Sequence, residues 1–222
     1  MVRRAASEAL GTAFLLMAIV GSGIMGERLA AGNVAIALLA NAIATGAALV
    51  ALILTFGAIS GAHFNPAVTL AVAVEARISW REVPAYLGAQ ITGAFAGVGA
   101  AHLMFGLPLL FASRHVRSGP AQLWSEFVAT FGLLFVILGC SRLRPSAVPW
   151  AVGSYITAAY WFTASTSFAN PVVTAARAVS DTFAGIRPTD APGFVVAQFA
   201  GAAAATLVAR WLVPAREARP HP

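Results

Sequence analysis

The sequence of 222 residues has no lysine, a single cysteine and few charged side chains of any kind. Charged residues make up only 10% of the chain, whereas a soluble domain usually contains about a quarter. So few charges cannot cover a water-facing surface on a chain of this length. The lone Cys140 excludes an internal disulfide and any cysteine cluster for zinc or iron–sulfur. No metal site or cofactor is therefore expected.

The chain is instead rich in long apolar runs, with 59% hydrophobic residues and a mean hydropathy of +0.80. A helix needs about 20 apolar residues to cross a hydrocarbon core of ~30 Å. Six runs meet that length, at roughly 5–26, 33–57, 83–106, 121–141, 147–167 and 191–213. They lack the strict alternation of a transmembrane β-barrel. The sequence predicts an all-α, multi-pass membrane protein in contact with the lipid bilayer.

The net charge of +6 comes from arginine alone among the basic residues. A basic chain can bind nucleic acid, but these arginines fall between the apolar runs rather than on one face, so we expect no nucleic-acid partner. Nine of them lie on the side of the N-terminus and five on the other side of the predicted topology. This bias predicts a protein of the cell (inner) membrane with both termini in the cytoplasm and a short cytoplasmic tail at 214–222.

Two further apolar stretches, at about 66–76 and 171–180, are only long enough for half a bilayer. Each is introduced by an Asn-Pro pair, at Asn65 and Asn170. Asparagine caps free backbone N–H groups, and proline at the first helical position loses nothing by lacking one. Short helices between spanning helices predict re-entrant segments, which are tolerated at membrane depth only when buried or lining a water-filled cavity.

Three features occur twice and in the same order along the chain. They are an early glutamate, an Asn-Pro box and a late glutamine, at Glu8 and Glu126, Asn65 and Asn170, and Gln90 and Gln198. We therefore expect one transmembrane domain over 1–222, with repeat one at about 5–106 and repeat two at about 121–213. Because each repeat has an odd number of spans, the second must be inverted about an axis in the membrane plane.

An inverted repeat brings the N-termini of the two half-helices together near the midplane. Each N-terminus carries roughly half a positive charge, so the pair repels cations. An oxygen that accepts from the amides of both Asn65 and Asn170 turns its hydrogens outward, which interrupts a chain of proton donors. The extended segments 61–64 and 165–169 also leave carbonyl groups without helical partners. The arrangement favours passage of an uncharged, hydrogen-bonding solute.

The segment from Ser60 to Thr69 reads Ser-Gly-Ala-His-Phe-Asn-Pro-Ala-Val-Thr. It resembles the first Asn-Pro-Ala box of the aquaporin/glycerol-facilitator (major intrinsic protein) family, and the repeated Glu and Gln positions are similar too. The resemblance implies a right-handed bundle of six transmembrane helices with two half-helices, a passive channel and a homotetramer. It implies pore boxes at Asn65, Pro66, Ala67, Asn170, Pro171 and Val172. It implies pore-lining loop residues at Gly61, Ala62, His63, Ser165 and Thr166.

The second box departs from the family pattern, because Asn170-Pro171-Val172-Val173 stands where most members have Asn-Pro-Ala-Arg. The resemblance then places the selectivity constriction at Thr45, Ala158, Ser167 and Val173. Such a ring, without an aromatic, imidazole or guanidinium group, should be wide. It is similar to an atypical bacterial group of aquaglyceroporins associated with arsenic resistance, which predicts water, glycerol-like solutes and neutral metalloids such as arsenite or methylated arsenicals as substrates.

Several alternatives stay open at this stage. Glu8 and Glu126 are either structural acceptors for the loops or ion carriers. Arg177, four residues after Val173, either guards the outer mouth or anchors a loop through Asp181. His63 either offers its backbone carbonyl to the pathway or binds a metal.

Function too has alternatives. The first is an ordinary water- or glycerol-selective aquaporin, and the second is a secondary active transporter, which also uses inverted repeats. An enzyme is not expected, because no motif pairs a nucleophile with a base.

Overall fold

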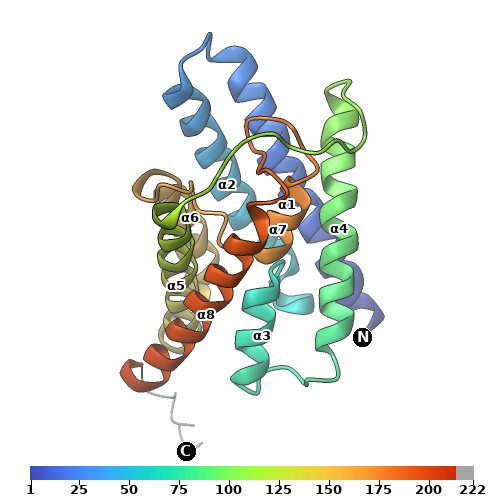
Figure 1. Ribbon diagram of the computed structural model, residues 1–222. Helices are drawn as coiled ribbons and strands as arrows, with labels where there is room; N and C mark the ends of the chain where they lie inside the picture. Colours follow the sequence, from blue (N-terminus) through green and yellow to red (C-terminus); the bar gives the residue numbers. More distant parts are fainter. Residues whose placement is uncertain (214–222) are drawn as a thin grey trace, which may run out of the picture.

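The computed structural model describes residues 1–213 and is built from helices joined by loops (Figure 1). The α-helices are α1 Val2–Leu29, α2 Val34–Ser60, α3 Pro66–Val74, α4 Val83–Met104, α5 Pro120–Leu143, α6 Val148–Phe162, α7 Pro171–Arg177 and α8 Ala191–Leu212, with a 3-10 turn η1 at Pro145–Ala147. The predicted tail at 214–222 lies outside the described residues.

The helices form two similar groups. In the first group α1 packs against α2 and α4, and in the second α5 packs against α6 and α8. The groups join where α2 meets α6, and the short helices α3 and α7 touch each other between them (Figure 1). We call the face on which α1 begins and α8 ends the terminal face. There the end of α3 is held by the end of α8, because Arg210 Nε donates to Glu75 Oε1 at 2.7 Å.

Two helix crossings are so close that only glycine fits. A Cβ on Gly93 of α4 would lie 2.1 Å from the carbonyl oxygen of Ala9 on α1. A Cβ on Gly201 of α8 would lie 2.4 Å from the carbonyl oxygen of Phe127 on α5. Small residues at such crossings let helix backbones approach each other in a membrane. The two crossings occupy equivalent places in the two groups.

The predicted span at 147–167 is too long. Helix α6 has 15 residues and ends at Phe162, which gives a length of only ~22 Å. Beyond it the chain returns to the middle of the molecule through residues with positive φ, including Thr166 at 62° and Ser167 at 51°. By length and hydropathy, four of the described helices are long and apolar enough to cross a membrane: α1, α2, α5 and α8.

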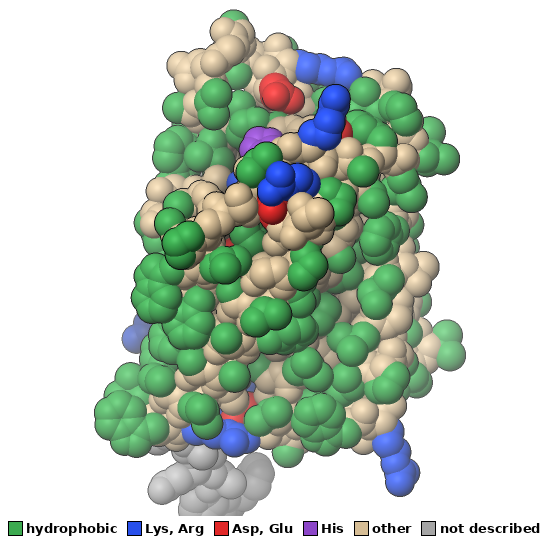
Figure 2. Space-filling model, in the orientation of Figure 1, with side chains coloured by type: hydrophobic (Ala, Val, Ile, Leu, Met, Phe, Trp, Pro, Cys, Tyr) green, Lys and Arg blue, Asp and Glu red, His purple; other side chains and the backbone are tan. Residues whose placement is uncertain are grey.

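The outer surface is suited to lipid. Figure 2 shows hydrophobic side chains over most of the visible side, with arginines gathered towards its two ends. All five tryptophans of the chain are exposed: Trp80, Trp124, Trp150, Trp161 and Trp211. Each lies near an end of a helix rather than at its centre, which is typical of the aromatic belts at the two membrane interfaces.

We predict that Gly93→Ala weakens the crossing of α4 with α1. The added methyl group cannot be placed without separating the helices, which should cost about 1–3 kcal/mol of unfolding free energy. Denaturant titration of the protein in micelles measures this. Gly88→Ala is the matched control on the same helix, because a Cβ there meets nothing within 4 Å. Equal stability of the two variants would contradict the prediction.

Candidate functional site

The two short helices begin as the Asn-Pro pairs predict. The Asn65 side chain accepts a bond from the backbone N–H of Ala67 at 2.9 Å. The Asn170 side chain accepts from Val172 at 3.1 Å and Val173 at 3.4 Å. Proline occupies the first helical position in both. Each asparagine therefore caps its own helix with its side-chain oxygen, and its amide nitrogen remains free to act elsewhere.

The amide nitrogens join the two helix tips. Asn65 Nδ2 donates to the carbonyl oxygen of Ala169 at 2.8 Å, and Asn170 Nδ2 donates to that of Phe64 at 2.8 Å. These bonds are reciprocal, as an inverted repeat requires. An amide nitrogen carries two N–H groups, and within residues 1–213 these are the only bonds that the two nitrogens donate. One N–H on each asparagine is thus left for a solute.

Glu8 fixes the loop before α3. Its Oε1 accepts bonds from Ser60 Oγ at 2.6 Å and from the backbone N–H of His63 at 2.9 Å. Its Oε2 accepts from the backbone N–H of Phe64 at 2.7 Å and from Gln90 Nε2 at 2.8 Å. The carboxylate is fully buried.

Glu126 repeats the arrangement before α7. It accepts from the backbone N–H groups of Phe168 at 2.8 Å and Ala169 at 2.9 Å, and from Gln198 Nε2 at 2.6 Å. It too is fully buried. Neither glutamate lines the cavities described below, and the bonds to both are those of loop anchors rather than of ion carriers.

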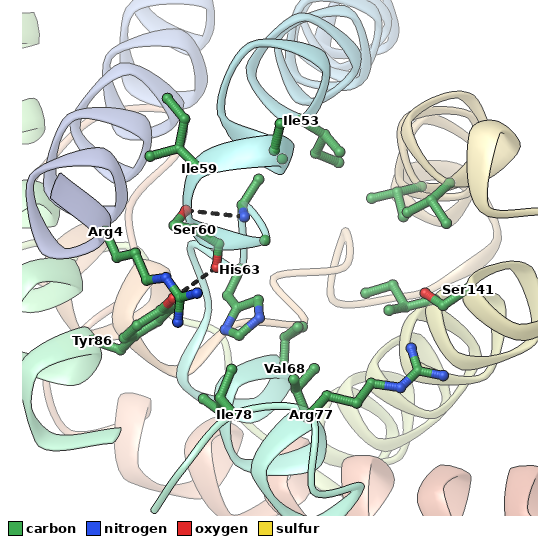
Figure 3. Close-up of a pocket in the computed structure, with 18 residues that line it drawn as sticks. Arg4, Ile53, Ile59, Ser60, His63, Val68, Arg77, Ile78, Tyr86 and Ser141 are labelled. Atoms are coloured by element: carbon green, nitrogen blue, oxygen red, sulfur yellow. Dashed lines mark hydrogen bonds between the residues drawn. The ribbon is translucent and has the colours of Figure 1, made fainter. Parts of the chain in front are cut away.

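Two adjoining cavities lie beside the joined tips. On the terminal face is a wide pocket of about 380 Å³, with the His63 ring pointing into it (Figure 3). It shares Ala62, His63 and Val68 with a narrow cavity of about 60 Å³. That narrow cavity is lined by both Asn65 and Asn170. The two asparagines therefore border one cavity, which adjoins the wide pocket of the terminal face.

Three of the four predicted constriction residues line the narrow cavity: Thr45, Ser167 and Val173. The prediction for Ala158 is wrong, because this residue is exposed on the outside of α6. Ile156 and Tyr160 line the cavity in its place. Which residues of α6 face inward is set by the helical period. Counting positions back from Asn170 does not follow that period, because the count crosses the non-helical loop between α6 and α7.

Tyr160 changes the expected character of the ring. Its hydroxyl lies 3.2 Å from Thr45 Oγ1, and either atom can donate. The ring therefore does contain an aromatic side chain, which the sequence prediction excluded. The Ser167 hydroxyl, in contrast, is buried with no hydrogen-bond partner among residues 1–213. It is a polar atom available to whatever occupies the cavity.

Three of the five predicted loop residues, Gly61, Ala62 and His63, line the wide pocket. The predictions for Ser165 and Thr166 are wrong, because these residues line neither cavity. Instead, Arg117 Nη1 donates to the Ser165 carbonyl oxygen at 3.2 Å and to Thr166 Oγ1 at 3.3 Å. The remaining box residues, Pro66, Ala67, Pro171 and Val172, are buried behind the helix tips. The exposed Trp161 and Phe162 do not reach the cavity.

The His63 ring contacts a threonine and a tyrosine. Its Nδ1 lies 3.1 Å from Thr69 Oγ1, and its ring packs 5.1 Å from that of Tyr86. No group of three metal-ligating side chains occurs within residues 1–213.

Arg177 is buried and lines the narrow cavity together with Val173. The proposed anchor through Asp181 is wrong, because Asp181 pairs with Arg114 at 2.8 Å. Backbone and side-chain bonds from Arg114 hold the pKa of Asp181 below its usual value. Sequence reasoning missed Arg117, which lies in the loop before α5 with no motif around it.

Comparison with known proteins agrees with this geometry. The profile of the family described as major intrinsic protein matches residues 1–147. The aquaglyceroporin AqpS of Rhizobium meliloti (strain 1021) is 57% identical over 217 residues, which cover 97% of this chain and 93% of that protein. The chain belongs to the major intrinsic protein family. This confirms the resemblance seen in the sequence.

More distant members share the same outline. Aquaporin NIP1-4 of Oryza sativa subsp. japonica is 36% identical over 208 residues, covering 89% of this chain and 72% of that protein. The X-ray structure of the aquaglyceroporin from Plasmodium falciparum superposes with a TM-score of 0.75 at 19% identity, with 96% of each chain covered. The predicted aquaporin-like helical bundle is thus confirmed. As a member of this family, the chain is a membrane channel and not an enzyme.

We predict that Ser167→Cys, in a Cys140→Ser background, makes the channel sensitive to mercury. A metal bound at this position fills a cavity of about 60 Å³, so most of the water permeability should be lost in a vesicle-swelling assay. Ser146→Cys in the same background is the control, because Ser146 is exposed at the end of the bundle. A Ser167→Cys channel that mercury leaves open would show that this side chain does not line the path.

Proposed function

We propose that the protein is a passive channel for small uncharged solutes, including water, glycerol-like molecules and neutral metalloids such as arsenite or methylated arsenicals. The observation that carries this proposal is the narrow cavity beside the joined helix tips, which is lined by Val173. By its resemblance to the family, Val173 stands in the place that most members give to arginine. A valine there removes both bulk and charge from the ring.

The lining of the cavity suits neutral molecules with hydroxyl groups. The two asparagine amides and the Ser167 hydroxyl offer hydrogen bonds on one side. Aliphatic side chains, among them Leu49 and Ile156, form much of the remaining wall. A path with a few polar atoms on an apolar wall replaces part of the hydration shell of a neutral solute but not that of an ion.

The relatives support a pathway wider than one for water alone. The Rhizobium meliloti protein, 57% identical, is named an aquaglyceroporin. The second box of dedicated glycerol facilitators reads Asn-Pro-Ala-Arg-Asp. This chain has Val173 and Thr174 in place of the two charged residues. We therefore propose a broader substrate range than glycerol.

Tyr160 supports the alternative of an ordinary water- or glycerol-selective aquaporin. Its ring occupies part of the constriction and its hydroxyl is held at 3.2 Å from Thr45. With this contact in place, the constriction is narrower than the sequence predicts. A secondary active transporter has less support, because Glu8 and Glu126 are committed to the loops.

The setting of the channel is also a proposal. We propose the inner membrane of the cell, both termini in the cytoplasm and a homotetramer, on the basis of the arginine distribution and the family resemblance. The exposed apolar side chains of α1 and α2 are available either to lipid or to neighbouring subunits.

A panel of solutes tests the proposed function. In stopped-flow measurements, vesicles with the protein should take up water, glycerol and neutral arsenite faster than bare vesicles. The rates should be unaffected by imposed proton or sodium gradients, because the buried carboxylates Glu8 and Glu126 are bound to the loops and do not line the cavities. Fast water uptake with arsenite uptake equal to that of bare vesicles would leave the water-selective alternative.

Val173→Arg should reduce the flux of bulky solutes more than that of water. The long side chain narrows the ring, and a molecule of glycerol size loses more clearance than a water molecule does. Val173→Leu is the companion variant, since it adds bulk without charge and should have a smaller effect. The ratio of glycerol to water permeability is the quantity to measure. An unchanged ratio in Val173→Arg would remove Val173 from the constriction.

A further inference from the structure

Arg177 is a buried cation with most of its donors unused. Its side chain lies at the end of α7, is 1% exposed, and lines the narrow cavity. Its Nε–H donates to the carbonyl oxygen of Ala184. A guanidinium group has five N–H donors, and within the described part of the chain Nε is the only nitrogen of this group with a partner. The terminal nitrogens are therefore available to the cavity.

An aromatic ring holds this guanidinium in place. The central carbon of the Arg177 guanidinium lies 3.4 Å from the centroid of the Phe168 ring. Phe168 is itself fixed, because its backbone N–H donates to Glu126 at 2.8 Å and its ring meets that of Phe194 edge to face at 5.3 Å. Stacking on an aromatic face suits the planar guanidinium and keeps it from swinging away.

Arg117 ties the surrounding loops together. Its Nε donates to the carbonyl oxygen of Gly185 at 2.8 Å, and its Nη1 to that of Ser165 at 3.2 Å. Its guanidinium also lies over Phe168, with 5.0 Å between its central carbon and the ring centroid. The residue is 9% exposed. Arg117 thus links the chain on both sides of α7 and adds a second positive charge next to Arg177.

Neither guanidinium takes part in a salt bridge among residues 1–213. Two of the nearby acids pair with other arginines: Asp181 with Arg114, and Asp190 with Arg187 at 2.8 Å. Glu126 binds only neutral donors, the loop N–H groups and Gln198, so its carboxylate offsets part of the charge of the two guanidinium groups. Two cations against this one carboxylate leave a net positive charge beside the cavity, where a low dielectric screens it little.

Arg177 is offset from Val173 along α7. It follows Val173 by four residues, so its Cα lies on the same face of the helix, about 6 Å further from the joined tips, while its side chain lines the same narrow cavity. The chain thus lacks a guanidinium at the second box but has one a single helical turn further along the same path.

We propose that Arg177, positioned by Phe168 and Arg117, is the residue that excludes cations from this channel. The role rests on the proposed function, since it presupposes a path for neutral solutes. The charge repels metal cations and hydronium at the far side of the ring from the terminal face, while the free N–H donors receive the oxygens of neutral solutes. Size selection at Val173 and charge selection at Arg177 are then separate.

Two substitutions separate the charge from the scaffold. Arg177→Gln removes the charge but keeps an N–H donor for Ala184, whereas Arg177→Lys keeps a positive charge. Each variant is reconstituted in vesicles. Glycerol uptake and the leak of potassium without added ionophore are measured on the same preparation. Arg187→Gln is the control, because it removes a charge from the adjoining loop, where the Arg187 side chain is 42% exposed.

We expect Arg177→Gln to raise the potassium leak at least about tenfold with glycerol uptake retained, and Arg177→Lys and Arg187→Gln to stay as tight as the unchanged protein. The proposal is overturned if Arg177→Gln conducts glycerol without leaking potassium, or if Arg177→Lys leaks as much as Arg177→Gln. Should Arg177→Gln not reconstitute, the same comparison is made with Arg177→Met against Arg177→Lys. A failure of the proposed function is distinct, because the unchanged protein would then take up no glycerol.

Discussion

The structure depends on bringing two helix N-termini together in the interior of an apolar bundle. Each N-terminus has unsatisfied N–H groups and partial positive charge, so two of them facing each other are unfavourable without compensation. Asn65 and Asn170 supply hydrogen-bond partners for these N-termini, because each caps its own helix and bonds to the loop of the other. Glu8 and Glu126 supply the opposite charge, because each places a buried carboxylate behind one loop. These bonds hold both loops in a non-helical conformation, in which Ala62, Phe64, Thr166, Ser167 and Ala169 have positive φ. The loops thereby border the cavities instead of closing them with a further helical turn.

The scaffold is symmetric, but the path is not. His63 and Phe168 hold equivalent places two residues before the asparagines. The ring of His63 bonds to Thr69 and borders a pocket of about 380 Å³. The ring of Phe168 supports two guanidinium groups next to a cavity of about 60 Å³. The phenyl ring at the second position thus gives that side of the path a support for cations that the imidazole at the first position does not provide.

The repeated residues could be predicted from the sequence because each has a partner at a fixed place in the other half. Glu126 and Gln198 are recognisable only through Glu8 and Gln90. The misassigned residues have no such support. Ala158 was located by counting across a loop whose length along the path is not written in the sequence, and Arg117 lies in a connection with no counterpart. Predicting Tyr160 as a lining residue requires knowing which face of α6 points inward, and that face depends on how α6 packs against α2.

Placing the cation one turn from the ring has a physical consequence. A guanidinium inside a constriction occupies space and repels cations at the same point, so the two effects cannot be tuned independently. With Val173 in the ring and Arg177 beyond it, the narrowest point can widen without loss of the positive potential along the axis. Coulomb repulsion falls only as the inverse of distance, whereas steric exclusion vanishes within an ångström or two. A charge whose backbone lies a helical turn away therefore still acts at the ring, even though Arg177 does not occupy the position of Val173.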